Sequence, residues 1–381
     1  MKSLTDIRES VLKCNRCGNC QYYCPSFAVS RLETYVARGR LQLMKKSLDT
    51  QSGISETFSK RVNQCLLCGN CSQNCPAGVC TEEMMETARA LDISQRGLSR
   101  PMELIAGNIS AVGNITGDGR ENRLLWFENM APGSVRVGEA AQYLYFAGCV
   151  PALYPSSYSV PQSFARLINK AGLDWAVMGE KESCCAYPLM IGGMTDEAAA
   201  MMEANAREVA ALGAGRLVTT CPSCYHMWKE IYPATVADMP DIEVYHSSRL
   251  LAELVDAGAF HFKETPCDVT YHDPCDLGRK SGLYDEPRRI IRSIPGANLV
   301  EMKFNRENAF CCGGGGNLEM NDAALSAKVA QLRVEQALRT GAQIIITSCQ
   351  QCKRTLMGGV RQTRARIKVM DLSEFVLSAI D

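Results

Sequence analysis

Short apolar runs alternate with longer amphipathic stretches over the C-terminal two thirds of the chain. The runs, rich in Tyr, Val, Ile and Thr as buried strands are, occupy positions 143–146, 217–220, 269–271 and 344–347. The stretches at 195–212 and 323–339 are dominated by Ala, Leu, Glu and Arg and predict helices. Because strands alternate with helices, we expect parallel sheets covered by helices in this part of the chain.

The N-terminal part has a different pattern. Its apolar positions between residues 32 and 44 are compatible with helix. They are Leu32, Tyr35, Val36, Leu41, Leu43 and Met44. A polar stretch from about Leu91 to Gly138 follows, and it contains Gly107, Gly113, Gly117 and Gly119. We expect this stretch to be a linker that packs partly through Trp126 and Phe127.

The composition excludes several classes of protein. A hydrophobic fraction of 46% and a charged fraction of 22% exclude a disordered, collagenous or coiled-coil chain. At roughly 150 residues per domain, a chain of 381 residues suggests two or three domains. Lys plus Arg and Asp plus Glu both number 41, and no basic stripe stands out, so binding to nucleic acid is disfavoured.

The apolar stretches also bear on localisation. None approaches the roughly 20 residues that cross a bilayer, so we expect no membrane span. The segment 1–10 has no apolar region of the kind found in secretory signals. We therefore expect a cytoplasmic protein, which could still dock at the cytoplasmic face of the membrane. In that reducing compartment the 20 cysteines are not a disulfide framework, and metal binding is the natural alternative.

Eight cysteines form a repeated motif, C-x2-C-x2-C-x3-C-P, whose two copies are 51 positions apart. The copies contain Cys14, Cys17, Cys20 and Cys24, then Cys65, Cys68, Cys71 and Cys75. This is the bacterial ferredoxin run, in which the fourth cysteine binds the other cluster. We therefore assign Cys14, Cys17, Cys20 and Cys75 to one [4Fe-4S] cubane, and Cys65, Cys68, Cys71 and Cys24 to the other. Zinc is the alternative, but eight ligands at this spacing fit two cubanes better.

Ten further cysteines form a larger repeat. One copy contains Cys149, Cys184, Cys185, Cys221 and Cys224, and the other contains Cys275, Cys311, Cys312, Cys349 and Cys352. Equivalent cysteines are 126 to 128 positions apart, which indicates a duplicated module of roughly 125 residues. Four of the ten follow predicted strands. Because ligands collect at the carboxyl ends of parallel strands, the five cysteines of each module could converge.

Zinc, an ordinary cubane, a disulfide and a thioredoxin-type redox pair each fit these modules less well than a site with several iron atoms. Five thiolates exceed the four that zinc or an ordinary cubane needs. A disulfide within Cys184-Cys185 would be a strained ring, and the pair recurs as Cys311-Cys312. The Cys221-Pro-Ser-Cys224 segment is similar to a thioredoxin-type redox pair, but its copy lacks the proline. A multi-iron site in each module is the better interpretation.

The combination of a two-cubane part with two complete modules resembles the D-type subunits of heterodisulfide reductase and their bacterial relatives, the CCG-domain iron-sulfur proteins. Further segments that carry the resemblance are Arg38 to Leu41, His272 to Cys275 and Cys311 to Gly316. The resemblance implies a noncubane [4Fe-4S] cluster in each five-cysteine set and cleavage of a disulfide between the two clusters. The ferredoxin cubanes would feed electrons inward, and the ten cysteines would be ligands at the catalytic site.

The resemblance also implies partners and an alternative function. A flavoprotein or other redox subunit would supply electrons, because no dinucleotide or flavin motif is present in the chain. The substrate would be a small-molecule or carrier-protein disulfide. Alternatively, the chain is an electron conduit, like the iron-sulfur subunits of glycolate and lactate oxidases, which have lost cysteines from one module. All ten are present here, which favours disulfide chemistry. One departure is Ala186, where the family usually has glycine after the cysteine pair.

The predicted fold class is a multidomain α+β and α/β protein. It has a mainly helical two-cluster ferredoxin-type domain at 1–95, a linker at 96–140, and duplicated α/β cysteine-rich modules at 141–265 and 266–381. The cysteines outside the sets, Cys80 and Cys267, are expected to be buried. His272 could donate a hydrogen bond or a proton near the second module's cluster or serve structure alone. Arg279, Lys280, Arg288 and Arg289 are expected to be solvated surface, although one of them could offset cluster charge or bind a substrate carboxylate. Gly313 to Gly316 are expected to form a tight turn around sulfur.

Overall fold

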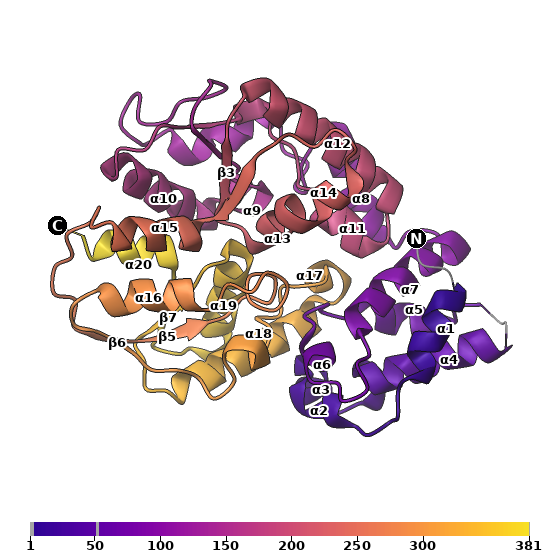
Figure 1. The fold of residues 1–381 in the computed structure, drawn as a ribbon. Coiled ribbons are helices and arrows are strands. Elements are labelled where there is room, and N and C mark those ends of the chain that lie inside the picture. Colours follow the sequence, from indigo (N-terminus) through magenta and orange to yellow (C-terminus); the bar gives the residue numbers. More distant parts are fainter. Residues whose placement is uncertain (1–3, 51–52, 381) are drawn as a thin grey trace.

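The computed structural model describes residues 4–50 and 53–380. Figure 1 shows three parts, which are a group of N-terminal helices in indigo and purple and two α/β parts in magenta to red and in orange to yellow. The N-terminal helices lie against both α/β parts. The mixed architecture that the sequence predicts, helical first and then duplicated α/β modules, is confirmed.

The N-terminal part, residues 4–50 and 53–96, contains helices and no strand. Its elements are α1 (Leu4–Leu12), α2 (Asn19–Tyr23), α3 (Pro25–Ser30), η1 (Glu33–Tyr35), α4 (Ala37–Thr50), α5 (Glu56–Asn63), α6 (Asn70–Gln73) and α7 (Thr81–Arg96). Apolar faces of the longer helices meet in one core that includes Leu41, Phe58, Val62 and Met85. The short helices α2 and α6 belong to the two cysteine loops, so burial of the longer helices positions those loops.

The predicted linker includes two helical elements. It contains α8 (Arg100–Val112) and η2 (Arg120–Phe127). Met102, Ile105 and Ile109 of α8, together with Trp126 of η2, enter the same hydrophobic core as the first sheet. Trp126 is 1% exposed, so the expected packing through this residue is seen, and the segment covers the first module.

Each module contains a parallel four-stranded sheet, with the orders β2-β1-β3-β4 and β6-β5-β7-β8. The strands of the first sheet are β1 (Tyr143–Tyr145), β2 (Trp175–Val177), β3 (Arg216–Thr219) and β4 (Glu243–His246). Those of the second are β5 (Cys267–His272), β6 (Ala297–Leu299), β7 (Ile344–Thr347) and β8 (Lys368–Asp371). In register, Leu144 lies beside Leu217, and Thr270 lies beside Ile345. The two sheets therefore have one topology, as a duplicated module requires.

Helices connect the strands in both modules. In the first they are α9 (Cys149–Leu153), α10 (Ser159–Lys170), α11 (Tyr187–Gly192), α12 (Thr195–Leu212), α13 (Pro222–His226), a π-helical η5 (Met227–Ile231), α14 (Tyr232–Thr235) and α15 (Ser247–Asp256), with short turns η3 (Pro155–Ser157) and η4 (Gly179–Lys181). In the second they are α16 (Asp285–Ser293), η6 (Arg306–Asn308), α17 (Leu318–Asn321), α18 (Ala323–Leu338), α19 (Gln350–Thr363) and α20 (Leu372–Ser378).

The two modules pack directly on each other. Helix α10 contacts α20, and α15 contacts α16, as Figure 1 shows for the stacked α15, α20 and α16. One hydrophobic core extends across this contact and includes Val269, Ile346 and Phe375 of the second module beside residues of the first. Within the described residues no helix is both long and apolar enough to cross a membrane.

Candidate iron-sulfur centre

The predicted ligands of each module follow the carboxyl ends of strands. Cys149 begins α9 just after β1, and Cys221 precedes α13 just after β3. The second module repeats this arrangement with Cys275 after β5 and Cys349 after β7. The vicinal pairs follow β2 and β6. The eighteen predicted ligands form no disulfide with one another, so their sulfurs are available for metal.

The five thiols of the first module converge into one hydrogen-bonded series. Contacts join Cys149 to Cys184, Cys184 to Cys185, Cys185 to Cys224, and Cys224 to Cys221. Hydrogen bonds from Cys184 and Cys224 lower the pKa of Cys185 to about 6, although burial opposes the change. Hydrogen bonds to Cys185 and Cys221, and then burial, raise the pKa of Cys224. The structure thus brings together all five cysteines that the sequence predicts for this module.

The second module repeats the same series. Here Cys275 contacts Cys311, Cys311 contacts Cys312, Cys312 contacts Cys352, and Cys352 contacts Cys349. Hydrogen bonds from Cys311 and Cys352 lower the pKa of Cys312 to about 6, which is the change found for its counterpart in the first module. Two independent stretches of sequence therefore build one thiol arrangement twice.

The donor set suits a soft, multi-metal group. The donor atoms of His272, Cys312 and Cys352 lie within 4.8 Å of one another, and all three residues are buried. A Cβ atom at Gly148, which has φ of +81°, would lie 3.1 Å from the sulfur of Cys224, so this left-handed glycine brings the backbone close to that thiol. Thiolates are the preferred ligands of iron-sulfur clusters, and five cysteines in one place, four of them buried, fit such a group.

One group of N-terminal cysteines combines members of the two runs. A small cleft is lined by Cys24 together with Cys65, Cys68 and Cys71. Burial raises the pKa of Cys71 well above its ordinary value, with further contributions from Cys68, Cys65 and Cys24. Cys24 of the first run is therefore placed with three cysteines of the second run.

A polar contact also joins the two runs next to Cys75. The amide nitrogen of the Asn19 side chain donates to the carbonyl oxygen of Asn74 at 2.6 Å, which places Cys75 beside the first run. Gly18 and Gly69, the residues after Cys17 and Cys68, have φ of +85° and +70° and begin the short helices α2 and α6. Left-handed backbone at these glycines lets each loop turn closely around its cysteines.

The group that contains Cys65 and Cys68 contacts the second module. A Cβ atom at Gly316 would lie 2.3 Å from the carbonyl oxygen of Cys65, and one at Gly315 would lie 2.8 Å from that of Leu66. The Nε of Arg279 donates to the carbonyl oxygen of Cys68. The glycines therefore serve a close approach between two ligand loops, a role that the predicted tight turn around sulfur does not include.

The two modules also meet at their cysteines. A hydrogen bond from Cys352 lowers the pKa of Cys349, whereas burial and the nearby Cys221 raise it above its ordinary value. Cys349 and Cys221 occupy equivalent positions in the two repeats. The C-x2-C segments of the two modules thus lie close enough for their charges to interact.

Several sequence predictions need correction. Among the four basic residues expected at the surface, only Arg289 is exposed; Arg288 is fully buried and pairs with Asp273 at 2.7 Å. Lys280 is mostly buried and pairs with Asp276 at 3.1 Å. The prediction of buried positions for Cys80 and Cys267 is also wrong, because Cys80 is exposed and Cys267 is partly exposed.

Ala186 adopts the left-handed conformation that the sequence made doubtful. Its φ is +69°, and its counterpart after the second cysteine pair is Gly313, with φ of +99°. The missing glycine therefore does not change the path of the backbone. An alanine in this conformation costs roughly 1 to 2 kcal/mol, which the packing around this fully buried residue offsets.

Sequence reasoning missed three buried basic or polar contacts. Arg89 donates to the carbonyl oxygens of Cys65, Ile191 and Gly316, and so joins the helical part to both modules. Arg123 donates to the sulfur of Cys149 at 3.4 Å. The Nε of Arg333 donates to the Nδ1 of His272 at 3.0 Å. No motif spacing marks these arginines; only the apolar character of their neighbours could have indicated burial.

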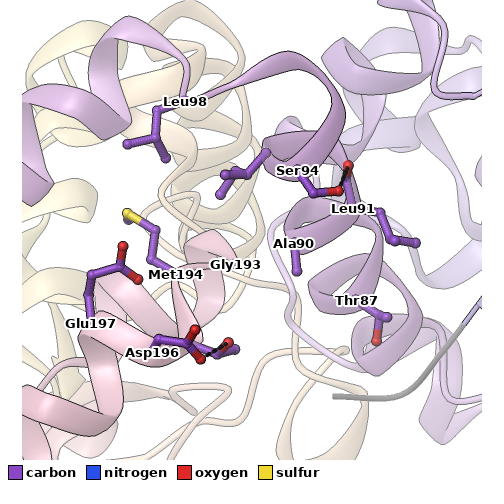
Figure 2. A pocket seen from close by; sticks show the side chains of 11 residues that line it. Thr87, Ala90, Leu91, Ser94, Leu98, Gly193, Met194, Asp196 and Glu197 are labelled. Carbon is purple, nitrogen blue, oxygen red and sulfur yellow. Dashed lines mark hydrogen bonds between the residues drawn. The ribbon is translucent and has the colours of Figure 1, made fainter.

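A cleft of about 440 Å³ lies away from these cysteines, between α7 and the α11–α12 turn (Figure 2). Thr87, Leu91 and Ser94 line one side of it, and Met194 and Glu197 line the other. None of the eighteen predicted ligands lines this cleft, so it is separate from the candidate centre.

Family models now identify the class. The cysteine-rich CCG domain matches residues 143–229 and 269–357, and the 4Fe-4S dicluster domain matches residues 10–79. The chain belongs to the iron-sulfur protein family that joins these domains and includes the D-type subunits of heterodisulfide reductase.

Individual relatives are consistent with these domains. The chain is 30% identical to the D-type subunit of the dihydromethanophenazine:CoB–CoM heterodisulfide reductase of Methanosarcina acetivorans, over all of this chain and 96% of that protein. It is 26% identical to the EtfAB:quinone oxidoreductase of Syntrophomonas wolfei, over 97% of this chain and 58% of that protein. These relatives establish the chain as an iron-sulfur electron-transfer subunit related to oxidoreductases.

A solved structure is similar in fold alone. A hypothetical protein from Helicobacter pylori superposes with a TM-score of 0.60 and 11% identity, covering 98% of this chain and 74% of that one. The same overall arrangement of helical part and modules is therefore known in a protein of very different sequence.

Proposed function

We propose that the protein is the disulfide-reducing iron-sulfur subunit of a larger redox assembly. The observation that carries the proposal is that two complete five-thiol series, identical in order, lie in modules whose C-x2-C segments interact. A protein that only conducted electrons would not need two complete and matched thiol sites in adjoining modules. The 30% identity to a heterodisulfide reductase component over the whole chain supports the same reaction.

The ligands divide into four sets under this proposal. Two cubane [4Fe-4S] clusters are held by Cys14, Cys17, Cys20 and Cys75 and by Cys24, Cys65, Cys68 and Cys71. Two noncubane [4Fe-4S] clusters are held by Cys149, Cys184, Cys185, Cys221 and Cys224 and by Cys275, Cys311, Cys312, Cys349 and Cys352. When bound, these clusters supply one-electron transfer in series and stabilisation of sulfur ligands on iron.

The chain itself supplies position and insulation. Gly315 and Gly316 allow the loop of Cys65 to approach the loop of Cys311 closely. The first module has Pro188 and Leu189 at the equivalent positions, so that approach is specific to the second module. Burial of eleven of the eighteen ligands, Cys312 among them, keeps water from their sulfurs.

The reaction balances with an external reductant. A reduced flavoprotein or another redox partner gives up two electrons, and the S–S bond of the substrate takes up two electrons and two protons to form two thiols. We propose that the electrons enter at residues 1–95 and leave at the modules 141–265 and 266–381, with 96–140 covering the first module. We place the assembly in the cytoplasm or at the cytoplasmic face of the membrane.

A second candidate function is an electron conduit without a substrate of its own. The relative named EtfAB:quinone oxidoreductase favours it, because a chain similar to this one forms part of that protein. In this case a flavoprotein would pass electrons through the chain to a quinone-reducing or membrane partner.

Low-temperature EPR on anaerobically purified, iron-reconstituted protein separates the two candidates. Spectra are recorded after oxidation, with and without small thiols and disulfides, for the wild type, Cys185→Ser and the control Cys267→Ser, whose cysteine lies outside the four sets. Disulfide reduction predicts a paramagnetic species that changes with added thiol in the wild type and in Cys267→Ser, but is lost in Cys185→Ser. Spectra that no thiol or disulfide alters would favour the conduit.

A further inference from the structure

Arg123 reaches a cluster ligand from outside the module. It lies in η2, its side chain is 2% exposed, and its Nη2 donates to the sulfur of Cys149 at 3.4 Å. The same Nη2 donates to the carbonyl oxygen of Gly113 at 3.2 Å, which fixes the plane of the guanidinium. A buried cation is thereby held against the first cysteine of the first set.

A buried carboxylate keeps this cation in place. The Nη1 of Arg123 pairs with Glu182 at 2.8 Å, and Glu182 also accepts hydrogen bonds from the backbone N–H groups of Ala147 and Gly148. Those two residues immediately precede Cys149. The ion pair therefore ties together η2, the segment before Cys184 and the loop that presents Cys149, and a flexible surface arginine could not provide such a fixed contact.

The second module has no equivalent within the described residues. Cys275 occupies the position of Cys149, but no arginine donates to its sulfur there. The nearby Arg279 instead gives its hydrogen bonds to the carbonyl oxygens of Cys68, Glu307 and Ala309. The residue two before Cys275 is Asp273, which pairs with Arg288. The two sites are thus alike in ligands, but in the described part of the chain only the first has an arginine that donates a hydrogen bond to the sulfur of its first ligand.

A cation and hydrogen bond at a thiolate favour the form of a site that carries more negative charge, which for a cluster is the reduced form. We propose that Arg123 tunes the first module by acting through Cys149 and raises the reduction potential of the cluster in that module. This rests on the proposed function, since it requires a cluster in each set.

The test is a redox titration followed by EPR on anaerobically reconstituted full-length protein. Arg123→Gln removes the charge at similar length, Arg123→Lys keeps it, and Glu182→Gln removes the opposing charge. Arg288→Lys is the matched control, since Arg288 is a buried, paired arginine without a cysteine contact. The signal lost in Cys185→Ser assigns the first module, and the signal lost in Cys312→Ser assigns the second.

We expect Arg123→Gln to lower the reduced-to-oxidised ratio of the first module about tenfold at a fixed potential, equivalent to about 59 mV for one electron. Arg123→Lys should change this ratio less, and Glu182→Gln should change it in the opposite direction. The second module's signal and Arg288→Lys should stay at the wild-type potential. An unchanged first-module potential in both Arg123→Gln and Glu182→Gln overturns the proposal, as does an equal shift of both modules.

Folding and the proposed function are checked separately. If Arg123→Gln binds too little iron to titrate, Glu182→Gln decides the outcome. Loss of the charge of Glu182 should raise the reduction potential of the first module, whereas loss of packing alone does not predict whether that potential rises or falls. Absence of any first-module signal in the wild type would instead remove the proposed function itself.

Discussion

The two modules share topology and ligand order but differ in what surrounds the ligands. In the second module His272 lies beside Cys312 and Cys352, and Arg333 donates to its Nδ1, which leaves the ring proton on Nε2. In the first module the equivalent residue is Phe146, which is fully buried. The two copies therefore keep the same site, whereas the neighbouring residues bring the Cys65 loop against one copy and Arg123 against the other.

The residue that ends the last strand of each sheet also differs between the modules. His246 ends β4 and accepts a hydrogen bond from the N–H of Ser248 at the start of α15. Asp371 ends β8 and accepts one from the N–H of Ser373 at the start of α20. Burial lowers the pKa of His246 to about 3 and raises the pKa of Asp371 to about 7. One structural position is thus filled by groups whose titrations affect stability in opposite directions.

The largest effect is expected for Gly316→Ala, which attacks the contact that only the second module makes. Its φ is +62°, and the new Cβ would lie 2.3 Å from the carbonyl oxygen of Cys65. We expect a loss of more than about 3 kcal/mol in the free energy of unfolding, since backbone atoms must move apart. Reduction of the second-module cluster should slow strongly in stopped-flow measurements.

Gly341→Ala is the matched control for this change. Gly341 has φ of +76°, but a Cβ there meets nothing within 4 Å. Only the left-handed backbone should cost stability, by roughly 1 to 2 kcal/mol, and electron transfer should be normal. Equal losses in the two variants would contradict a specific contact between the ligand loops.

Substitutions at the residue after each cysteine pair should change the free energy of unfolding less. Gly313→Ala would place a Cβ 2.5 Å from the carbonyl oxygen of Ser326, so we expect a loss of about 2 to 3 kcal/mol. Ala186→Gly relieves strain but removes a buried methyl group, so the free energy of unfolding should change by less than about 1 kcal/mol. Denaturant unfolding measures both. Similar losses in the two variants would show that the modules do not differ at this position.

Asp371 and His246 predict how the free energy of unfolding depends on pH. Asp371 is protonated in the folded protein up to about pH 7, so its contribution is complete below about pH 4 and is lost as pH rises. His246 stays neutral in the folded protein, so its contribution is present above about pH 6.5 and is lost as pH falls. Between about pH 5 and 6.5 the two slopes cancel.

Removing one member should expose the slope of the other. In Asp371→Asn the free energy of unfolding should rise with pH by about 1.4 kcal/mol per pH unit more than in the wild type over this range. In His246→Gln it should fall with pH by a similar amount relative to the wild type. Denaturation at pH 5.5 and 6.5 tests this, and parallel pH profiles for all three proteins would contradict the assignment.

The sequence was informative where a physical requirement leaves a pattern. Apolar runs and helix patterns predicted β1, β3, β5 and β7 and helices α12 and α18, because buried strands and helices require apolar residues at regular positions. Cysteine spacing predicted both thiol series, because a cluster requires ligands at fixed positions. It was uninformative for Arg89 and Arg123, since their partners are backbone carbonyls and a sulfur far away in the sequence. Ala186 shows a further limit, because packing overrode the preference for glycine.

The most direct test of the central claim, that each five-cysteine set holds its own cluster, is the iron and sulfide content of anaerobically reconstituted protein. Four clusters predict about 16 iron atoms per chain, falling to about 12 in Cys185→Ser and in Cys312→Ser. Mössbauer spectra of the same samples would show which iron is lost. About 8 iron atoms in all three proteins would contradict the claim, since the helical part alone would then hold metal.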